Sequence, residues 1–207
     1  DLHKEYRRQR QMCIRDSIIG SLAESWEISP DGLTYTFHIR QGVHFALDPD
    51  SEASRLVNGR ELTADDVVYS YQRFTAQGDF TERPLKPGPT FNLPWESIEA
   101  TGEYTVVMKL KEPYLDALQP ILNSSQNWIL PRDVIEHYGN YEDWKNVVGT
   151  GPFMITDWAK GSSITYTKNP NYWGYDEKYP ENRLPYADEV KFLFMTEAAT
   201  KIAALRT

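Results

Sequence analysis

The chain has 207 residues, of which 40% are hydrophobic and 13% aromatic, and it carries a formal net charge of −8. This length and apolar content suffice for one large domain or two small ones with a real core. The acidic balance argues against nucleic acid as a partner, and the lack of a long apolar run predicts no membrane-spanning segment.

The first sixteen residues differ from the rest of the chain. They carry five basic and three acidic side chains, a net charge of +2, which leaves −10 for the remainder. The run RRQRQMCIRD looks like the translation of a sequencing adapter joined to a gene fragment, so residues 1–16 are expected to be a non-native or disordered tail. The alternative is a basic arm that binds nucleic acid or membrane. Under the first interpretation His3 and the single cysteine, Cys13, have no functional role, and the signal peptide is missing.

A β-hairpin is predicted at residues 22–40. Apolar and polar residues alternate from residue 33 onward, which indicates a strand with one buried face. The turn is predicted at Ser29-Pro30-Asp31-Gly32, because Pro30 presets φ and Gly32 can adopt a positive φ. The predicted apolar face comprises Leu33, Tyr35, Phe37 and Ile39, with Leu22, Trp26 and Ile28 of the preceding arm.

A surface loop and then a helix are predicted next. Residues 46–57 contain the polar run DPDSEAS and lack the spacing of a calcium-binding EF-hand loop. A helix is predicted at 64–74, with Thr63 as its N-cap and Asp65 and Asp66 in its first turn. Side chains of adjacent helical residues point about 100° apart, so these two carboxylates fit capping better than acid–base catalysis.

The remaining elements indicate an α+β or mixed α/β fold. We expect a loop at 78–94, a second hairpin at 97–111, and a helix at 114–123 that Pro120 kinks or ends. A helix at 132–138, closed by Gly139, precedes a hairpin at 154–168. A strand at 189–195 and a helix at 197–205 with Thr196 as its N-cap complete the expected elements.

Catalytic and metal-binding motifs are absent from the sequence. It contains four histidines but no G-x-S-x-G, no H-E-x-x-H and no Cys/His cluster. His38 and His44 are six residues apart, which is not a known metal-ligand spacing. The sequence therefore predicts a protein that is not an enzyme and that holds no metal and no cofactor.

Four segments in order carry a family resemblance. They are LAESWEISPDGLTYTFHIRQGVHF (22–45), NGRELTADDVVYSYQRF (58–74), GTGPFMITDWAKGSSITYTKNPNYWG (149–174) and LPYADEVKFLFM (184–195). Together they resemble the family 5 extracellular solute-binding proteins, the periplasmic oligopeptide-, dipeptide- and nickel-binding receptors of bacterial ABC importers. The resemblance implies an incomplete fold similar to type II periplasmic binding proteins. Residues 17–148 would form the small second domain and residues 149–207 a truncated part of the first domain.

The resemblance also implies a function. A protein of this kind captures peptides or similar small solutes in a cleft between two lobes and delivers them to the ABC transporter permease subunits. It would be a periplasmic or extracytoplasmic monomer, associated with the membrane only through the permease or a missing lipid anchor. The residues that pair with the charged ends of a peptide would lie beyond Thr207.

Three residues are candidates for contact with the ligand. Thr150 and Gly151 lie where the resemblance places the crossing between domains, and Trp173 lies in the NPNYW segment. The structural alternatives are a tight turn for the first two and a packed aromatic for Trp173. Two other functions stay open at this point: the ligand-sensing domain of a transcription regulator, and a peptide or glycan hydrolase.

Overall fold

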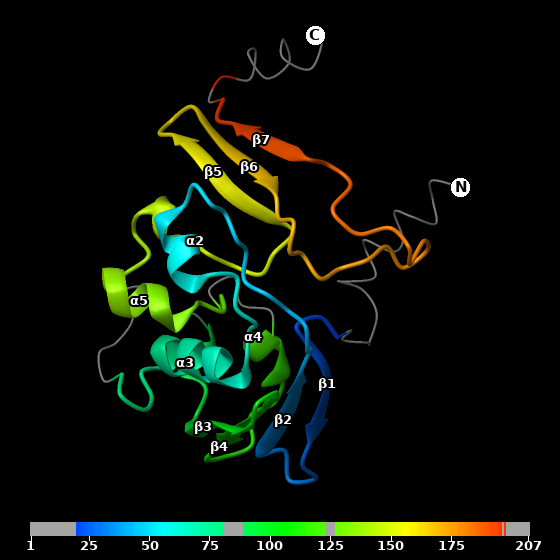
Figure 1. The fold of residues 1–207 in the computed structure, drawn as a ribbon. Helices are drawn as coiled ribbons and strands as arrows, with labels where there is room; N and C mark the ends of the chain where they lie inside the picture. The colour runs from blue at the N-terminus through cyan, green and yellow to red at the C-terminus, as the bar shows by residue number, and fades with distance from the viewer. Residues whose placement is uncertain (1–19, 81–88, 123–126, 196, 198–207) are drawn as a thin grey trace.

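Two antiparallel sheets organise the chain (Figure 1). The computed structural model describes residues 20–80, 89–122, 127–195 and 197. The predicted tail at 1–16, Thr196 and nearly all of the helix predicted at 197–205 lie outside these residues. The first sheet has the order β1-β2-β4-β3, and the second has the order β5-β6-β7. The strands are β1 (Ala23–Ile28), β2 (Thr34–Ile39), β3 (Trp95–Gly102), β4 (Thr105–Leu110), β5 (Phe153–Ala159), β6 (Ser163–Lys168) and β7 (Glu189–Leu193).

The predicted first hairpin is confirmed. Strands β1 and β2 pair antiparallel, and Gly32 has a φ of 70° and donates its N–H to the carbonyl of Ser29 at 2.8 Å. The buried residues of β2 are the predicted Tyr35, Phe37 and Ile39. The prediction for Ile28 is wrong, since this side chain is 44% exposed at the turn end of the edge strand β1.

Gly32 offers a clean test of the turn. A Cβ at this position would meet no atom within 4 Å, so Gly32→Ala carries only the cost of a positive φ, about 1 kcal/mol of the free energy of unfolding. Gly149→Ala is the matched control, because Gly149 has the same open surroundings without a positive φ. Urea denaturation of both variants measures the difference, and equal midpoints would contradict the assigned turn.

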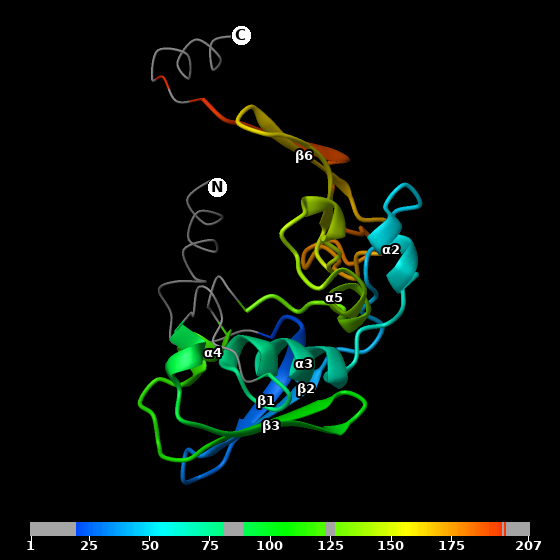
Figure 2. The same ribbon diagram turned by 90° about the vertical axis from the view of Figure 1, so that its left-hand side faces the viewer.

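Helix α3 (Ala64–Thr75) covers one face of the first sheet (Figure 2). Its predicted position is confirmed to within one residue. Tyr71 of α3 is buried and donates its hydroxyl to the carbonyl of Ile121 at 2.6 Å. Gln72 Nε2 donates to the carbonyl of Ile98 in β3 at 2.9 Å. The main core therefore lies between this sheet and α3.

The loop prediction for residues 46–57 is wrong in its second half. Helix α2 (Glu52–Val57) forms there, with Ser51 as its N-cap and Asn58 in the left-handed conformation at its C-terminus. Ala53 and Val57 are buried in the main core. Six residues are too few for a stable isolated helix, so this tertiary packing stabilises α2.

The other helices are short. They are α4 (Leu118–Leu122), α5 (Arg132–Tyr138) and the 3₁₀ turns η1 (Pro89–Asn92) and η2 (Trp144–Asn146). Of the residues predicted to be helical at 114–123, those that the structure describes form a helix only at Leu118–Leu122. Pro120 lies in the first turn of this helix rather than at a kink, and a missing N–H is tolerated in a first turn. Helix α5 and its closure by Gly139, with a φ of 78°, are as predicted.

Candidate functional site: a basic and aromatic pocket

The connection at residues 149–151 is held from both sides. The N–H of Ala46 donates to the carbonyl of Gly149 at 2.9 Å, and Asn169 Nδ2 donates to the carbonyl of Gly151 at 2.8 Å. Thr150 and Gly151 therefore lie in a backbone crossing between the two sheets. Within the described part of the chain, neither residue lines the pocket that contains Trp173.

Trp173, the third candidate, packs against the protein and also lines a pocket. Its half-buried ring packs against the main core and tilts against the ring of Tyr172 at a centroid distance of 5.4 Å. The guanidinium of Arg40 lies over the Trp173 ring, 4.9 Å from its centroid. Trp173 is thus a packed aromatic that also forms part of a pocket surface.

The pocket lies between the end of the first sheet and the loop that follows β6. Its volume is about 670 Å³. Two arginines and one glutamate give the lining a net charge of +1, which favours an anionic group. The lining residues are Glu24, Arg40, Gln41, Gly42, Trp173, Tyr175 and Arg183.

Backbone carbonyls hold both arginines of the pocket. Arg40 Nε donates to the carbonyl of Ser21 at 3.1 Å, and Arg183 Nε donates to the carbonyl of Tyr172 at 2.6 Å. Among residues 20–80, 89–122 and 127–195, no carboxylate forms an ion pair with either guanidinium. Among the described residues, neither arginine is neutralised by a direct ion pair, and the lining keeps its net charge of +1.

Asp176 shapes the loop that carries Arg183. Its Oδ1 accepts the N–H of Lys178 at 2.7 Å and of Tyr179 at 2.9 Å, and its Oδ2 accepts the hydroxyl of Tyr186 at 2.9 Å. The backbone hydrogen bonds from Tyr179 and Lys178 hold the pKa of Asp176 below its usual value. The carboxylate stays charged at neutral pH and keeps the loop folded back beside Trp173.

Glu61 fixes the opposite rim of the pocket. The N–H of Gly42 donates to Glu61 Oε1 at 2.5 Å, and Gly42 has a φ of 73°. Loss of hydration raises the pKa of the nearby Tyr104 phenol to about 12, and the Glu61 carboxylate acts in the same direction. The position of Gly42 thus depends on the segment that carries Glu61.

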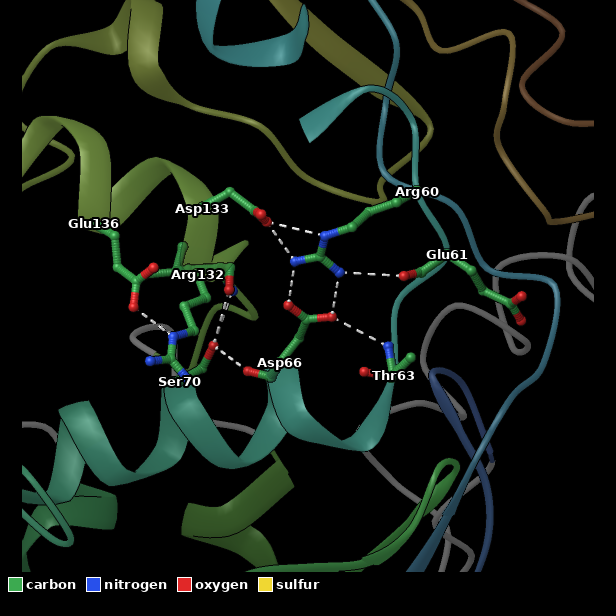
Figure 3. A network of polar contacts seen from close by, with 9 residues as sticks. Arg60, Glu61, Thr63, Asp66, Ser70, Arg132, Asp133 and Glu136 are labelled. Carbon is green, nitrogen blue, oxygen red and sulfur yellow. Dashed lines mark hydrogen bonds and ion pairs between the residues drawn. The ribbon is translucent and has the colours of Figure 1, made fainter. Parts of the chain in front are cut away.

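An ion-pair network holds that segment (Figure 3). Arg60 donates from its two terminal nitrogens to the two oxygens of Asp66, at 2.8 and 2.7 Å. It also donates to Asp133 Oδ2 of α5 at 2.9 and 2.6 Å. The hydrogen bond to Asp66 raises the pKa of Arg60, so the guanidinium is charged at every physiological pH.

Asp66 caps α3 as predicted and has a second role. Its Oδ2 accepts the N–H of Thr63 at 3.1 Å, while the same carboxylate binds Arg60. Asp65 is exposed and contributes only to the charge of the first turn. The network therefore ties α3, α5 and the pocket rim together, a connection that no spacing in the sequence indicates.

The described residues hold no cluster of three or more His, Cys, Asp or Glu side chains that could bind a metal. His38 Nε2 lies 3.9 Å from Glu27 on an exposed strand face, and His44 Nδ1 lies 2.9 Å from the carbonyl of Gly59. None of the described helices combines the length and the apolar composition that a membrane span requires.

A second concave surface lies between α2, η2 and β5. Its volume is about 800 Å³. Its lining mixes acidic side chains such as Asp48 and Asp143 with Arg55 and Lys145, and it includes Gly149. It contains none of the three predicted ligand-contact residues.

The chain is similar in sequence to a family of bacterial binding proteins. Residues 17–207 match the family model described as bacterial extracellular solute-binding proteins, family 5 middle. The di/tripeptide-binding protein 2 of Pseudomonas aeruginosa is 32% identical over 170 residues, covering 76% of this chain and 30% of that protein. The chain spans about a third of the length of the relatives it matches.

Solved structures agree in fold. The periplasmic binding protein DppA of Helicobacter pylori, in complex with the peptide STSA, is 30% identical with a TM-score of 0.69, covering 92% of this chain and 36% of that one. The protein MoaA of A. tumefaciens R10, in complex with mannopinic acid, is 27% identical with a TM-score of 0.67, covering 92% and 34%. These matches confirm the predicted mixed α/β fold of periplasmic binding proteins.

Proposed function

The chain belongs to family 5 of the bacterial extracellular solute-binding proteins, and we propose that the protein is the substrate-binding component of an ABC importer. The observation that carries this proposal is the family match across residues 17–207, which includes every described strand and helix. The protein captures a peptide or similar small solute between two lobes and delivers it to the permease subunits. It performs no chemistry on the solute.

The location and partners follow from the same proposal. The family is extracellular by its description, and a relative of known structure is periplasmic. These descriptions support a location outside the cytoplasm. We also propose that the protein is a monomer and that it meets the membrane through the permease or a lipid anchor. The negative net charge supports a role without nucleic acid.

We also propose the division into residues 17–148 and 149–207 as parts of two domains. Support comes from the first sheet, which has its own core with α3, whereas the second sheet begins after the crossing at 149–151. The second sheet exposes large apolar side chains, including Trp158 and Phe192. Such a face is typical of a sheet that another layer covers.

Trp173 is the proposed ligand-contact residue that the pocket supports best. It shares a concave surface with two arginines, and aromatic rings beside a few polar groups are typical of ligand sites. A ligand contact by Thr150 and Gly151 stays a prediction. Their carbonyl and amide groups could pair with an extended peptide backbone, as in strand-like recognition.

A thermal-shift and calorimetric panel tests the proposal. The protein expressed from its complete gene is titrated with Ala-Ala, Ala-Ala-Ala and Ser-Thr-Ser-Ala, with mannopinic acid as the non-peptide probe. We expect at least one peptide to raise the Tm in a concentration-dependent way, because a ligand that binds only the folded state stabilises it. Binding of mannopinic acid alone would shift the substrate class away from peptides. Turnover of a bound peptide would contradict the binding-protein proposal.

A further inference from the structure

We propose that one face of the second sheet is the docking surface for the chain's own residues 197–205, the segment that the sequence predicts to be helical. The contact lies within the protein and is independent of the solute that the protein binds. It supplies the layer that covers the exposed apolar side chains of this sheet.

The docking surface consists of two rows of side chains that cross β5, β6 and β7. Cross-strand partners point to the same side of a sheet, and the register gives six such residues, which we call the apolar face: Trp158, Ile164 and Phe192 in one row, and Ile155, Tyr166 and Val190 in the next. The rings of Tyr166 and Phe192 meet at a centroid distance of 5.7 Å. The described residues bury none of the six, and Trp158 and Phe192 are 41% and 57% exposed.

The opposite side of the same sheet is more polar. It carries Leu193, but also Thr165, Thr167 and Lys191. Covering the apolar face therefore removes more apolar surface from water, and the free energy gained by burial rises with that area.

The connection after β7 holds the segment beside this sheet. Only Phe194 and Met195 lie between the end of β7 at Leu193 and the predicted N-cap, Thr196. The N–H of Phe194 donates to the carbonyl of Ser162 at 2.8 Å, which ties the exit of β7 to the β5–β6 hairpin. Connections this short place consecutive elements side by side. The tether also gives the segment a high effective concentration at the sheet, which a second copy of the chain lacks.

Residues 197–205 have the length and the pattern that the apolar face requires. Nine helical residues extend about 13 Å, and three strands span about 10 Å between the outer two. Ala198, Ile202 and Leu205 follow one another at intervals of four and three residues, which places them in one stripe along a helix. Thr200 and Ala204 would lie on the opposite side. The stripe therefore packs on the sheet while the polar side faces away from it.

The test measures how fast a thiol on the apolar face reacts with a maleimide, read at that position by peptide mass spectrometry. Phe192→Cys is the reporter in the protein expressed from its complete gene. Lys191→Cys is the matched control, because it lies next in the same strand on the opposite side and is exposed. Each reporter is combined with Ile202→Glu, which adds a charge to the stripe, or with Ala204→Glu, which adds the same charge to the other side of the helix.

We expect Phe192→Cys to react at least about tenfold more slowly than Lys191→Cys, because a covered thiol reacts only when the segment opens locally. Ile202→Glu should raise the rate at position 192 at least about tenfold, since a buried unpaired carboxylate opposes docking. Ala204→Glu should leave that rate unchanged.

A third reporter shows whether the sheet itself stays folded. Ser163 is 4% exposed, so the thiol of Ser163→Cys should stay slow to react when only the segment is displaced. If Ile202→Glu accelerates this thiol as well, Ile202→Ala replaces it, since it removes the apolar contact without adding a charge. This milder variant should still raise the rate at position 192 and not at position 163.

Two outcomes would overturn the inference. Equal rates for Phe192→Cys and Lys191→Cys would show that the face is uncovered. A slow reaction at position 192 that neither Ile202 variant accelerates would show that another segment or a second copy of the chain covers the face. Neither result bears on peptide binding, so the proposed function stands or fails separately.

Discussion

Replacing Arg60 with methionine is expected to lower the free energy of unfolding by about 3 kcal/mol, the typical cost of removing one partner of a buried ion pair. Asp66 is only 3% exposed, so the variant leaves its carboxylate in the protein interior without a cation. Methionine retains most of the aliphatic length that packs over Phe45, whose ring lies 5.1 Å from the guanidinium. The expected loss of stability therefore comes from the uncompensated charge of Asp66 and not from a cavity.

The solvent exposure of the two side chains in each ion pair determines how much that pair contributes to stability. The side chains of Arg60 and Asp133 are 35% and 39% exposed, so solvent screens their pair and it contributes little. Arg132→Met is the matched control, because its pair with Glu136 has both side chains more than half exposed. We expect it to cost at most about 0.5 kcal/mol.

Urea denaturation of the two variants measures the difference. Adding Asp66→Asn to Arg60→Met should recover at least about 1 kcal/mol, since the buried charge is then gone. Similar midpoints for Arg60→Met and Arg132→Met would show that the buried position of Asp66 carries no penalty. That result would contradict the role given to the network in holding Glu61 and the rim of the pocket.

The parts of the fold that could be predicted are those set by local pattern. The alternation in β2 and the turn at Gly32 lie within a few residues of one another, so the sequence alone is sufficient to indicate them. Helix α3 is indicated in the same way by Thr63, its acidic first turn and its apolar stripe. The family resemblance added the order of these elements, and the fold comparison confirmed it.

The two errors in the helices have a common cause. Helix α2 has a polar sequence whose helical conformation depends on burying Ala53 and Val57 against residues distant in the chain. The helix predicted at 114–123 has a suitable local pattern, yet among its described residues only Leu118–Leu122 is helical. In both cases tertiary contacts outweigh intrinsic helix propensity, which amounts to less than about 1 kcal/mol per ordinary residue.

The site could be predicted only in part. Trp173 is a candidate from the sequence because it lies in the NPNYW segment of the family resemblance. Arg40, by contrast, ends an ordinary alternating strand, and Arg183 lies in a charged loop. They come together because residues 169–185 fold back against the end of the first sheet. Asn169 has a weak local signal, since asparagine before proline favours a turn, but its long-range bond to Gly151 is not indicated by the sequence.

Asn169→Ala is expected to lower the free energy of unfolding by about 2 kcal/mol, because it removes the partner of two backbone groups in a buried setting. Asn169 is 1% exposed. Its Nδ2 donates to the carbonyl of Gly151 at 2.8 Å, and its Oδ1 accepts the N–H of Asn171 at 2.9 Å. The variant should also loosen the segment that positions Trp173, so affinity for a recognised peptide should fall with it.

Asn140→Ala is the matched control for this effect. Asn140 Oδ1 accepts the N–H of Glu142 at 2.9 Å in the same two-residue pattern, but at an exposed position. Water replaces that bond, so the expected cost is at most about 0.5 kcal/mol. Urea denaturation gives the stability of each variant, and calorimetry with Ser-Thr-Ser-Ala or the tightest panel peptide gives the affinity. If Asn169→Ala loses stability but keeps its affinity for the peptide, the hydrogen bonds of Asn169 do not position the pocket. That result would reject Trp173 as a ligand contact that Asn169 holds in place.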